Sequence, residues 1–453
     1  MPPSNDRIPL EIDLATRLSD AVGRWPQDRP LAMLASHAGD EDPSRDAVFL
    51  AAPTQRHELR GPDTFDALRS LLGETPAPVR TEPSIHPSGR GHLVMLSYDL
   101  FRGLEPTAIH PEGARDDRSW PDAVVLRCDG GHLLQSEGIV GVGDPVPIPP
   151  PGPGGPQAAE IGPLTSGMDR SAYETIVADV VERIHRGDCF QANLAQRFTA
   201  PYRGNARAVA LAAFAAGIPR HGAMLECGDG RTVISMSPEL FLDVRPMESG
   251  RRVATGPIKG TRPASARMEE LLHSEKDAAE LAMIVDLMRN DLGRVCDIGS
   301  ISVDCPRRIE THRTVHHGVA HVSGALRDDV DLVDLLRGTF PPGSITGAPK
   351  VQAMRIIDEL EPVRRGPYCG SIGWIDDEGW SRFNVAIRTI MCTDPVHEGD
   401  GQSEGLLDYI AGCGIVAESD PASEWRESLD KTAVLRNAIT HLTEVAESPG
   451  TSA

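Results

Sequence analysis

A single lysine lies inside a short stretch rich in proline, glycine and threonine, residues 252–263 (RVATGPIKGTRP). Pro257 fixes its own backbone dihedral, and Gly256 and Gly260 permit conformations that other residues avoid, so the stretch predicts a tight turn. If the amine of Lys259 is also partly removed from water, it becomes a neutral nucleophile near neutral pH. The alternative for this stretch alone is a solvated loop lysine.

Candidate acid–base groups lie on both sides of that lysine in the sequence. Glu239 follows a Ser-Pro pair and precedes an apolar run, where a carboxyl group can have a raised pKa and act as a general acid. The alternative is a capping or edge-strand carboxylate. The histidines His316, His317 and His321 are further acid–base candidates, or hydrogen-bonded core residues.

Three glutamates could together hold a divalent cation. Glu280 lies within a helix predicted over about 269–292, and Glu424 and Glu427 lie near the start of a helix predicted over about 423–446. A spacing of three places Glu424 and Glu427 on one helix face, and Lys431 continues that face. Carboxylates from two helices, with room for water and a substrate oxygen, suit Mg²⁺. The alternative is a set of solvated surface charges.

Two glycine-rich runs and one arginine could bind anions. Backbone N–H groups of the runs at 340–350 and 411–416 could cradle an anion, but a tight structural turn is the simpler interpretation of both. Arg388 interrupts an apolar segment predicted as a strand, where a guanidinium usually faces a carboxylate of the protein or of a ligand.

The elements that must position these groups are strands and helices in alternation. Short apolar runs predict strands at 31–35, 47–51, 92–98 and 123–127. Helical spacing predicts a helix from about 169 to 187, and alternation predicts a strand over 188–198. The predicted regions are 1–143, rich in strands; 144–165, a Pro/Gly-rich linker or loop; 166–446, the catalytic domain; and 447–453, a disordered tail.

Composition excludes several classes of function. The chain has 453 residues, 40% of them hydrophobic, which is a globular composition. A formal net charge of −21 argues against a nucleic-acid partner. The 8 cysteines form no Cys-x-x-Cys pair, so a zinc site is not expected. Because no signal peptide and no membrane-spanning apolar run are recognisable, we expect a soluble cytoplasmic protein with reduced thiols.

Taken together, these stretches resemble the chorismate-utilising enzymes: anthranilate synthase large component, aminodeoxychorismate synthase component I, and isochorismate and salicylate synthases. The resemblance runs from about Tyr173 to Lys431, whereas residues 1 to about 140 match only loosely, mainly at Ser97-Tyr98-Asp99. It is carried by GDCFQANLAQ (187–196), SPE (237–239), PIKGTRP (257–263), IVDLMRNDLGR (284–294), GSITGAPK (343–350), IRT (387–389), GIV (414–416) and SDP (419–421). It implies an α+β fold in which large antiparallel sheets pack as a sandwich with helices on the outside.

The resemblance also implies roles for individual residues. Glu280 and Glu427, with Glu424 nearby, would hold a Mg²⁺ that neutralises the ring carboxylate of chorismate, assisted by Gly414 and Lys431. Arg388 and Tyr368 would hold the enolpyruvyl carboxylate. Lys259 would attack ring carbon 2 while Glu239 protonates the departing 4-hydroxyl, and ammonia would then add at carbon 4 and expel the lysine. Thr346 and His317 match further active-site positions, although the sequence after His317 departs from the family pattern and leaves His321 as an alternative.

Two positions discriminate between members of the family. Isochorismate and salicylate synthases have a lysine base where this chain has Gln191, a substrate-binding candidate, and anthranilate synthases typically have alanine where it has Lys259. The resemblance therefore points to aminodeoxychorismate synthase component I, which makes 4-amino-4-deoxychorismate in p-aminobenzoate and folate biosynthesis. The alternatives are anthranilate synthase component I and a catalytically silent chorismate-binding subunit. Since no glutaminase domain is recognisable, we expect a separate glutamine amidotransferase subunit to supply ammonia.

Overall fold

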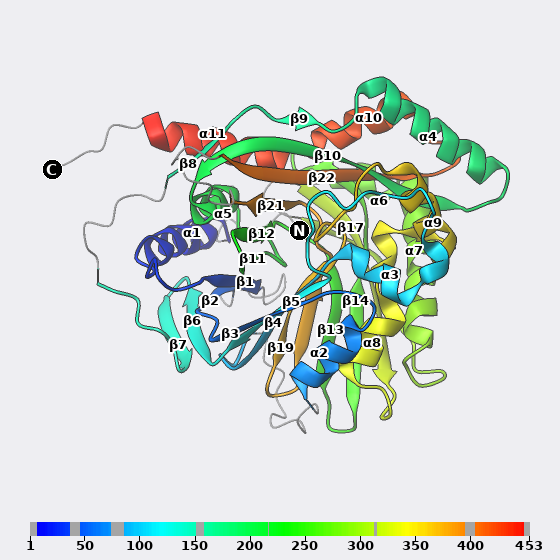
Figure 1. The fold of residues 1–453 in the computed structure, drawn as a ribbon. Coiled ribbons are helices and arrows are strands. Elements are labelled where there is room, and N and C mark those ends of the chain that lie inside the picture. Colours follow the sequence, from blue (N-terminus) through cyan, green and yellow to red (C-terminus); the bar gives the residue numbers. More distant parts are fainter. Residues whose placement is uncertain are drawn as a thin grey trace.

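Two large antiparallel sheets form the centre of the molecule in a computed structural model, and helices cover their outer sides (Figure 1). The structure describes residues 7–36, 46–73, 86–150, 158–215, 217–311, 315–394 and 404–447. Residues 151–157 of the predicted linker and 448–453 of the predicted tail lie outside this description. The predicted α+β class, with antiparallel sheets packed face to face, is confirmed.

The first sheet has 12 strands, and its long strand β10 lies second from one end of the strand order. In spatial order its strands are β18 (Gly347–Ala348), β10 (Gln191–Gly204), β22 (Gly405–Ile415), β21 (Thr389–Thr393), β12 (Arg231–Ser235), β11 (Ala223–Gly228), β1 (Ala32–Ser36), β2 (Ala47–Ala51), β6 (Gly130–Gln135) and β7 (Gly138–Gly143). The short strands β8 (Ala159–Ile161) and β9 (Thr165–Ser166) also pair with β10.

The second sheet has 10 strands and contains the lysine stretch at one edge. Its order is β15 (Ile258–Pro263), β17 (Val315–Leu326), β14 (Arg251–Gly256), β13 (Leu240–Pro246), β20 (Ser381–Asn384), β19 (Ser371–Asp376), β4 (Gly91–Leu96), β5 (Ala123–Cys128) and β3 (Gln55–Leu59), with β16 (Ser302–Thr311) paired to β17. Strands from the first 143 residues enter both sheets, so each sheet is built from N-terminal and C-terminal parts of the chain.

The main hydrophobic core lies between the two sheets. Phe49 of β2 and Trp374 of β19 meet there edge to face, with ring centroids 5.2 Å apart. Strand β10 is buried on both faces, because Leu194 packs outward under helices and Ala195 packs into the main core. This double burial fits the sequence from Gln191 to Gln196, where the strand has only apolar and uncharged polar residues.

Helices cover the outer faces of the sheets. Helices α1 (Arg7–Gly23), α5 (Ala206–Ala215) and α11 (Ala433–Glu447) pack together on the first sheet, and α4 (Arg170–His185), α9 (Lys350–Leu360) and α10 (Pro421–Asp430) lie over β10 and β22 (Figure 1). Helices α6 (Met268–Leu272) and α7 (Glu275–Gly293) pack on β15, β16 and β17. The remaining helices are α2 (Thr64–Leu72), α3 (Phe101–Leu104) and α8 (Leu332–Thr339), with short 3-10 turns η2 (Tyr98–Leu100), η3 (Pro106–Ala108) and η4 (Gly343–Ile345).

Two predicted helices are each broken in two. The helix predicted over 269–292 divides into α6 and α7 because the Ser274 side chain caps a new N-terminus by accepting from the Asp277 N–H. The helix predicted over 423–446 divides into α10 and α11, and Lys431 is the C-terminal cap of α10. None of the helices in the described part of the chain is long and apolar enough to cross a membrane.

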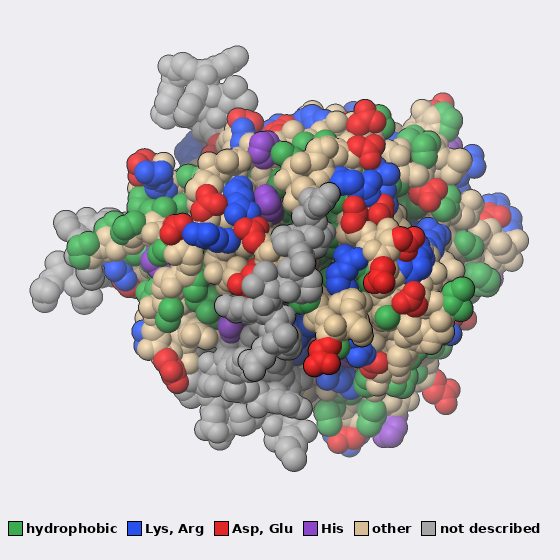
Figure 2. All heavy atoms as spheres, turned by 90° about the horizontal axis from the view of Figure 1, so that it is seen from below, with side chains coloured by type: hydrophobic (Ala, Val, Ile, Leu, Met, Phe, Trp, Pro, Cys, Tyr) green, Lys and Arg blue, Asp and Glu red, His purple; other side chains and the backbone are tan. Residues whose placement is uncertain are grey.

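The surface seen from below carries charges of both signs. On this face, Lys and Arg side chains are interspersed with Asp and Glu and do not gather into one basic area (Figure 2). Many charged side chains of the described residues are paired across elements, as in the bidentate contact between Arg127 and Asp377, with N–O distances of 2.6 Å. Such pairs at the surface contribute little stability individually.

Candidate active site

The candidate residues gather at an uncovered edge of strand β22. β10 pairs with β22 along residues 405–415, but on the other side β21 pairs only with residues 406–409. From Ile410 to Ile415, no other described strand covers that second edge. The run at 411–416 is therefore mainly strand, not the predicted turn. Its Gly412 carbonyl accepts a hydrogen bond of 2.7 Å from Lys431 Nζ.

Lys259 reaches this edge from the second sheet. The lysine stretch is a strand, β15, not an isolated turn, but its pairing with β17 is irregular between Ile258 and Thr261, and Gly260 has a φ of +81°. Lys259 Nζ lies 3.0 Å from the point where a Cβ on Gly414 would stand, so the absent side chain of Gly414 makes room for the amine. Burial lowers the pKa of Lys259, and the nearby Lys431 lowers it further, while Glu280 acts in the opposite direction. The neutral, nucleophilic form of the amine is thereby favoured.

Glu239 lies beside the lysine as a buried acid. Its backbone N–H donates to Ser237 Oγ at 3.1 Å, and its carbonyl accepts from the Val385 N–H at 3.0 Å, so its position is fixed. Burial raises the pKa of the Glu239 carboxyl to about 7, although a hydrogen bond from Ser344 and the charge of Lys259 both lower it. A carboxyl group with this pKa can donate a proton near neutral pH.

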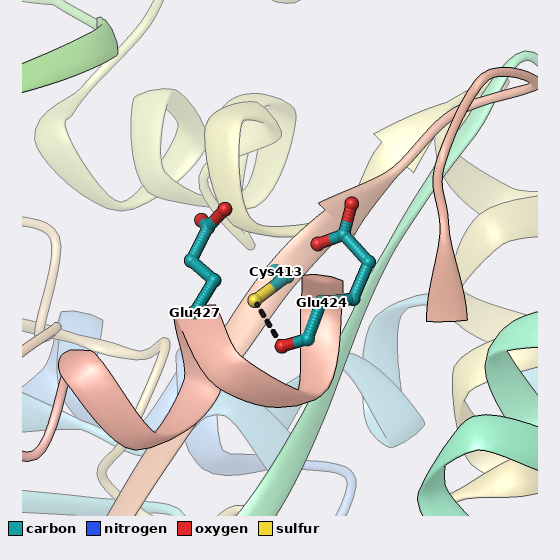
Figure 3. A group of neighbouring side chains, drawn as sticks. All are labelled: Cys413, Glu424 and Glu427. Atoms are coloured by element: carbon teal, nitrogen blue, oxygen red, sulfur yellow. Dashed lines mark hydrogen bonds between the residues drawn. The ribbon is translucent and has the colours of Figure 1, made fainter. Parts of the chain in front are cut away.

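Glu424 and Glu427 project from one face of α10 toward Cys413 of β22 (Figure 3). One carboxylate oxygen of each glutamate and the Cys413 sulfur all lie within 4.8 Å of one another. Burial raises the pKa of Glu424. Burial alone would also raise the pKa of Glu427, but Lys431, 2.8 Å away, outweighs it and the pKa falls.

Two adjacent carboxylates beside a strand edge fit a hard cation such as Mg²⁺. The third member of the group does not, because burial raises the pKa of the Cys413 thiol to about 12 and so keeps it protonated. Glu280, on α7, lies outside this compact group but within electrostatic range: burial raises its pKa, Lys259 lowers it and Glu427 contributes to raising it. The structure thus brings Glu424 and Glu427 together and places Glu280 near them.

Arg388 was predicted to lie within a strand, but in the structure it lies outside one. It stands between β20 and β21 with a φ of +51°, and its carbonyl accepts from the Met236 N–H at 3.0 Å. Its guanidinium makes no hydrogen bond or salt bridge with another described residue, although Glu239 and Tyr409 act on it electrostatically. An arginine in this state is available to bind a ligand carboxylate.

Tyr368 and Gln191 complete the lining beside the two glycines of β22. Tyr368 Oη lies 3.1 Å from where a Cβ on Gly412 would stand, and Gln191 Nε2 lies 3.1 Å from the equivalent point on Gly414. The Gln191 side chain is fully buried, yet neither of its amide atoms hydrogen-bonds to a described residue. Such a group costs free energy unless something else satisfies it, so it is suited to a ligand contact.

His317 is tied to the lysine strand and His321 is not. The Nδ1 atom of His317 lies 3.0 Å from Thr261 Oγ1 of β15, and the ring is buried. His321 instead lies 3.6 Å from Glu310, whose carboxylate also binds Arg308 and Arg220. This arrangement favours His317 as the active-site histidine.

The glycine-rich run at 340–350 is mainly structural. Lys350 Nζ is buried and donates to Asp291 Oδ2 at 2.6 Å, Thr339 O at 2.8 Å and Pro341 O at 2.9 Å, so it is not free for a ligand. Thr346 is fully buried; its hydroxyl donates to Gly343 O at 3.0 Å and its carbonyl accepts from the Asn193 N–H at 2.7 Å. The run thereby joins the site to β10.

Sequence reasoning did not single out Gly412 and Cys413 as site residues. Both lie in the run at 411–416, where the alternation of glycine with larger residues was the available signal: Gly412 and Gly414 share one face of β22, and Cys413 points to the other. The alternation indicates a strand with one face kept clear for close approach.

Comparisons with known proteins agree with this fold. The family model described as "chorismate binding enzyme" matches residues 37–437, so the chain belongs to the chorismate binding enzyme family. It is 36% identical over 401 residues to aminodeoxychorismate synthase component 1 of Salmonella typhimurium, covering 84% of this chain and 82% of the relative. It is 35% identical to anthranilate synthase component 1 1 of Haloarcula marismortui over an alignment of 480 residues, gaps included, which covers 96% of this chain and 92% of the relative.

Other similarities are more local or concern the fold alone. Identity reaches 42% over 284 residues with aminodeoxychorismate synthase component 1 of Klebsiella aerogenes, a match that spans 61% of this chain and 59% of the relative. The fold superposes on the crystal structure of anthranilate synthase component I from Streptococcus pneumoniae with a TM-score of 0.71 at 24% identity, covering 90% of this chain and 93% of that chain. The relatives therefore carry both names.

Proposed function

We propose that the protein is an aminodeoxychorismate synthase component I, which converts chorismate and ammonia into 4-amino-4-deoxychorismate and water. The observation that carries the proposal is the pairing of Lys259 with Glu239. Burial lowers the pKa of the lysine amine and raises the pKa of the carboxyl to about 7, so one shift favours the nucleophilic form of the amine and the other keeps an acid available near neutral pH.

The reaction balances with these two groups. The neutral Lys259 amine forms a bond to ring carbon 2, the ring double bonds shift, and the bond from carbon 4 to its hydroxyl breaks as Glu239 donates a proton, releasing water. Ammonia then forms a bond to carbon 4, the double bonds shift back, and the bond between carbon 2 and Lys259 breaks. The excess proton on the new amine returns to the Glu239 carboxylate. The enolpyruvyl group is retained.

The remaining residues bind the two carboxylates of the substrate. Arg388 and Tyr368 would hold the enolpyruvyl carboxylate, since the guanidinium makes no salt bridge with a described residue and the tyrosine hydroxyl lies against the face of β22 at Gly412. Glu280, Glu424 and Glu427 would hold Mg²⁺, with Lys431 and Gly414 beside them. When bound, the cation supplies positive charge that neutralises the ring carboxylate.

Intact-protein mass spectrometry tests the covalent step. After incubation with chorismate and Mg²⁺ without ammonia, we expect a covalent adduct on the unmodified protein and none on a Lys259→Ala variant. Lys276→Ala alters an exposed lysine of α7 whose Nζ lies 3.9 Å from Glu280, and at saturating Mg²⁺ this lysine control should keep the adduct. An adduct that persists in Lys259→Ala would show that another residue reacts and would remove the basis of the proposal.

The second candidate function is that of an anthranilate synthase component I, which would release pyruvate and aromatise the ring. The match to the Haloarcula marismortui relative, over 96% of this chain, favours it. A catalytically silent chorismate-binding subunit is a third alternative, and failure of chorismate to bind in the presence of Mg²⁺ would support it. The presence of Lys259 distinguishes the proposed function from the second.

A further inference from the structure

A buried arginine outside the candidate site hydrogen-bonds to two segments that carry candidate site residues. Arg365 lies in the loop between α9 and β19 and is only 2% exposed. Its guanidinium donates to Glu361 through Nε at 2.9 Å and Nη2 at 2.6 Å, to Ile345 O through Nη1 at 3.2 Å, and to Asn193 O through Nη2 at 2.5 Å.

These hydrogen bonds connect the loop that carries Thr346 to the strand that carries Gln191. Ile345 directly precedes Thr346, and Asn193 lies on β10 two residues beyond Gln191. Glu361 extends the same connection, because its Oε1 atom also accepts from the Ala195 N–H at 2.8 Å. This loop and this strand are therefore both hydrogen-bonded to the buried pair of Arg365 and Glu361. Removing one partner of such a buried pair leaves the other uncompensated.

The same guanidinium also lies over two tyrosine rings. The Arg365 carbon Cζ is 4.6 Å from the centroid of Tyr98 and 5.8 Å from that of Tyr368, both within the range of a cation–π contact. Tyr98 belongs to the Ser97-Tyr98-Asp99 motif, which no proposed catalytic role includes. That motif is attached to the arginine loop, because the Tyr98 N–H donates to Gly366 O and the Gly366 N–H donates to Asp99 Oδ2, each at 2.8 Å.

We propose that Arg365 is a positioning residue for chorismate: its guanidinium, supported by the Tyr98 ring, sets the orientation of the Tyr368 ring, whose hydroxyl lies against the face of β22 at Gly412. The inference rests on the proposed function only for Tyr368 as a contact to the enolpyruvyl carboxylate. Lysine cannot replace Arg365, because a point charge does not provide the planar, forked contacts made here. The N-terminal motif thereby acts on the substrate site through Arg365.

A double-mutant cycle tests this role. KM and kcat are measured for loss of chorismate, whichever product forms, in the unmodified protein, Arg365→Lys, Tyr368→Phe and the double variant. We expect each single variant to raise KM about tenfold with little change in kcat, and the double variant to resemble the single ones, because the arginine acts through the tyrosine. Arg364→Lys, at a half-exposed neighbour paired with Asp116 at 3.0 Å, should leave both constants unchanged.

A purely structural role gives different results. If the two effects multiply, or if Arg365→Lys lowers the melting temperature while KM stays unchanged, Arg365 does not position Tyr368. If Arg365→Lys fails to fold, Tyr98→Leu replaces it in the cycle, since it removes one supporting ring and leaves every hydrogen bond of the guanidinium intact. An unchanged KM in that variant would also overturn the proposal. Formation of anthranilate in these assays would count against the proposed function alone.

Discussion

At the scale of single residues, the chemistry depends on two groups whose pKa values are shifted toward each other. Lys259 is a base made less basic by burial and by Lys431, and Glu239 is an acid made weaker by burial. We expect Lys259→Ala to lower kcat for amination by roughly a thousandfold or more, because a covalent step is lost. The product is measured by chromatography at saturating chorismate and ammonium. Near-normal amination by this variant would contradict a covalent mechanism.

The pH dependence follows from the protonated form of Glu239. The raised pKa of about 7 means that the acid form predominates below that pH and is lost above it. We therefore predict that kcat for the first half-reaction falls as pH rises through about 7, and that Glu239→Gln lowers kcat by roughly a hundredfold and abolishes this alkaline limb. Rates of adduct formation across pH, measured without ammonia so that its own titration does not interfere, provide the comparison. A limb that persists in Glu239→Gln would assign it to another group.

We predict that the carboxylates of α10 determine how much Mg²⁺ the protein needs for turnover. Glu427→Gln should raise the Mg²⁺ concentration needed for half-maximal chorismate turnover by about tenfold or more, since one hard oxygen ligand is weakened. Cys413→Ala is the matched control because its protonated thiol is a poor Mg²⁺ ligand, and it should change the requirement little. Titration of Mg²⁺ against activity and against intrinsic fluorescence separates binding from catalysis. A larger effect from Cys413→Ala than from Glu427→Gln would exclude the proposed ligand set.

At the scale of elements, the site depends on the unpaired part of β22 and on the glycine-rich run at 340–350, which is held by buried contacts. Lys350 and Asp291 form a buried pair that joins the glycine-rich run to α7, with side chains 10% and 3% exposed. We predict that Lys350→Met destabilises the fold by about 3 kcal/mol, because a buried carboxylate loses its partner, and that adding Asp291→Asn recovers part of this loss. Chemical denaturation measures both. Equal stability of the single and double variants would show that the pair is not coupled.

Local sequence patterns predicted most elements but missed features that tertiary packing decides. The runs at 31–35, 47–51 and 123–127 became strands as predicted, because apolar periodicity reports burial directly. The break at Ser274 was missed since a polar residue on a helix face looks the same whether or not it caps. Arg388 was predicted in a strand because its neighbours are apolar. In the structure it has a left-handed conformation, and its carbonyl accepts a hydrogen bond from the distant Met236 N–H.

The same limit applies to the site. Spacing alone predicted that Glu424 and Glu427 share a face, and the structure confirms it. The approach of Cys413, the nearness of Glu280 and the room left by Gly414 for Lys259 depend on how α7, α10 and the two sheets meet, which no local pattern encodes. Resemblance to a family supplied the candidate residues that periodicity could not.

At the scale of the whole molecule, the question is where ammonia comes from. The Klebsiella aerogenes and Salmonella typhimurium relatives are named component 1 of aminodeoxychorismate synthase, a name that implies a second component. We propose that this chain acts with a separate glutamine amidotransferase. We predict that the purified chain aminates chorismate with ammonium salts and not with glutamine alone, and that adding an amidotransferase component restores glutamine-dependent turnover. Glutamine-dependent activity in the isolated chain, with no partner detected by gel filtration, would contradict this.

The identity of the product tests the central claim most directly. Purified protein is incubated with chorismate, Mg²⁺ and ammonium, and the mixture is assayed for 4-amino-4-deoxychorismate by mass spectrometry, for pyruvate enzymatically and for anthranilate by fluorescence. The proposed function predicts that chorismate is converted to 4-amino-4-deoxychorismate with its enolpyruvyl group retained and without release of pyruvate. Pyruvate and anthranilate appearing in amounts equal to the chorismate consumed would contradict it and identify an anthranilate synthase.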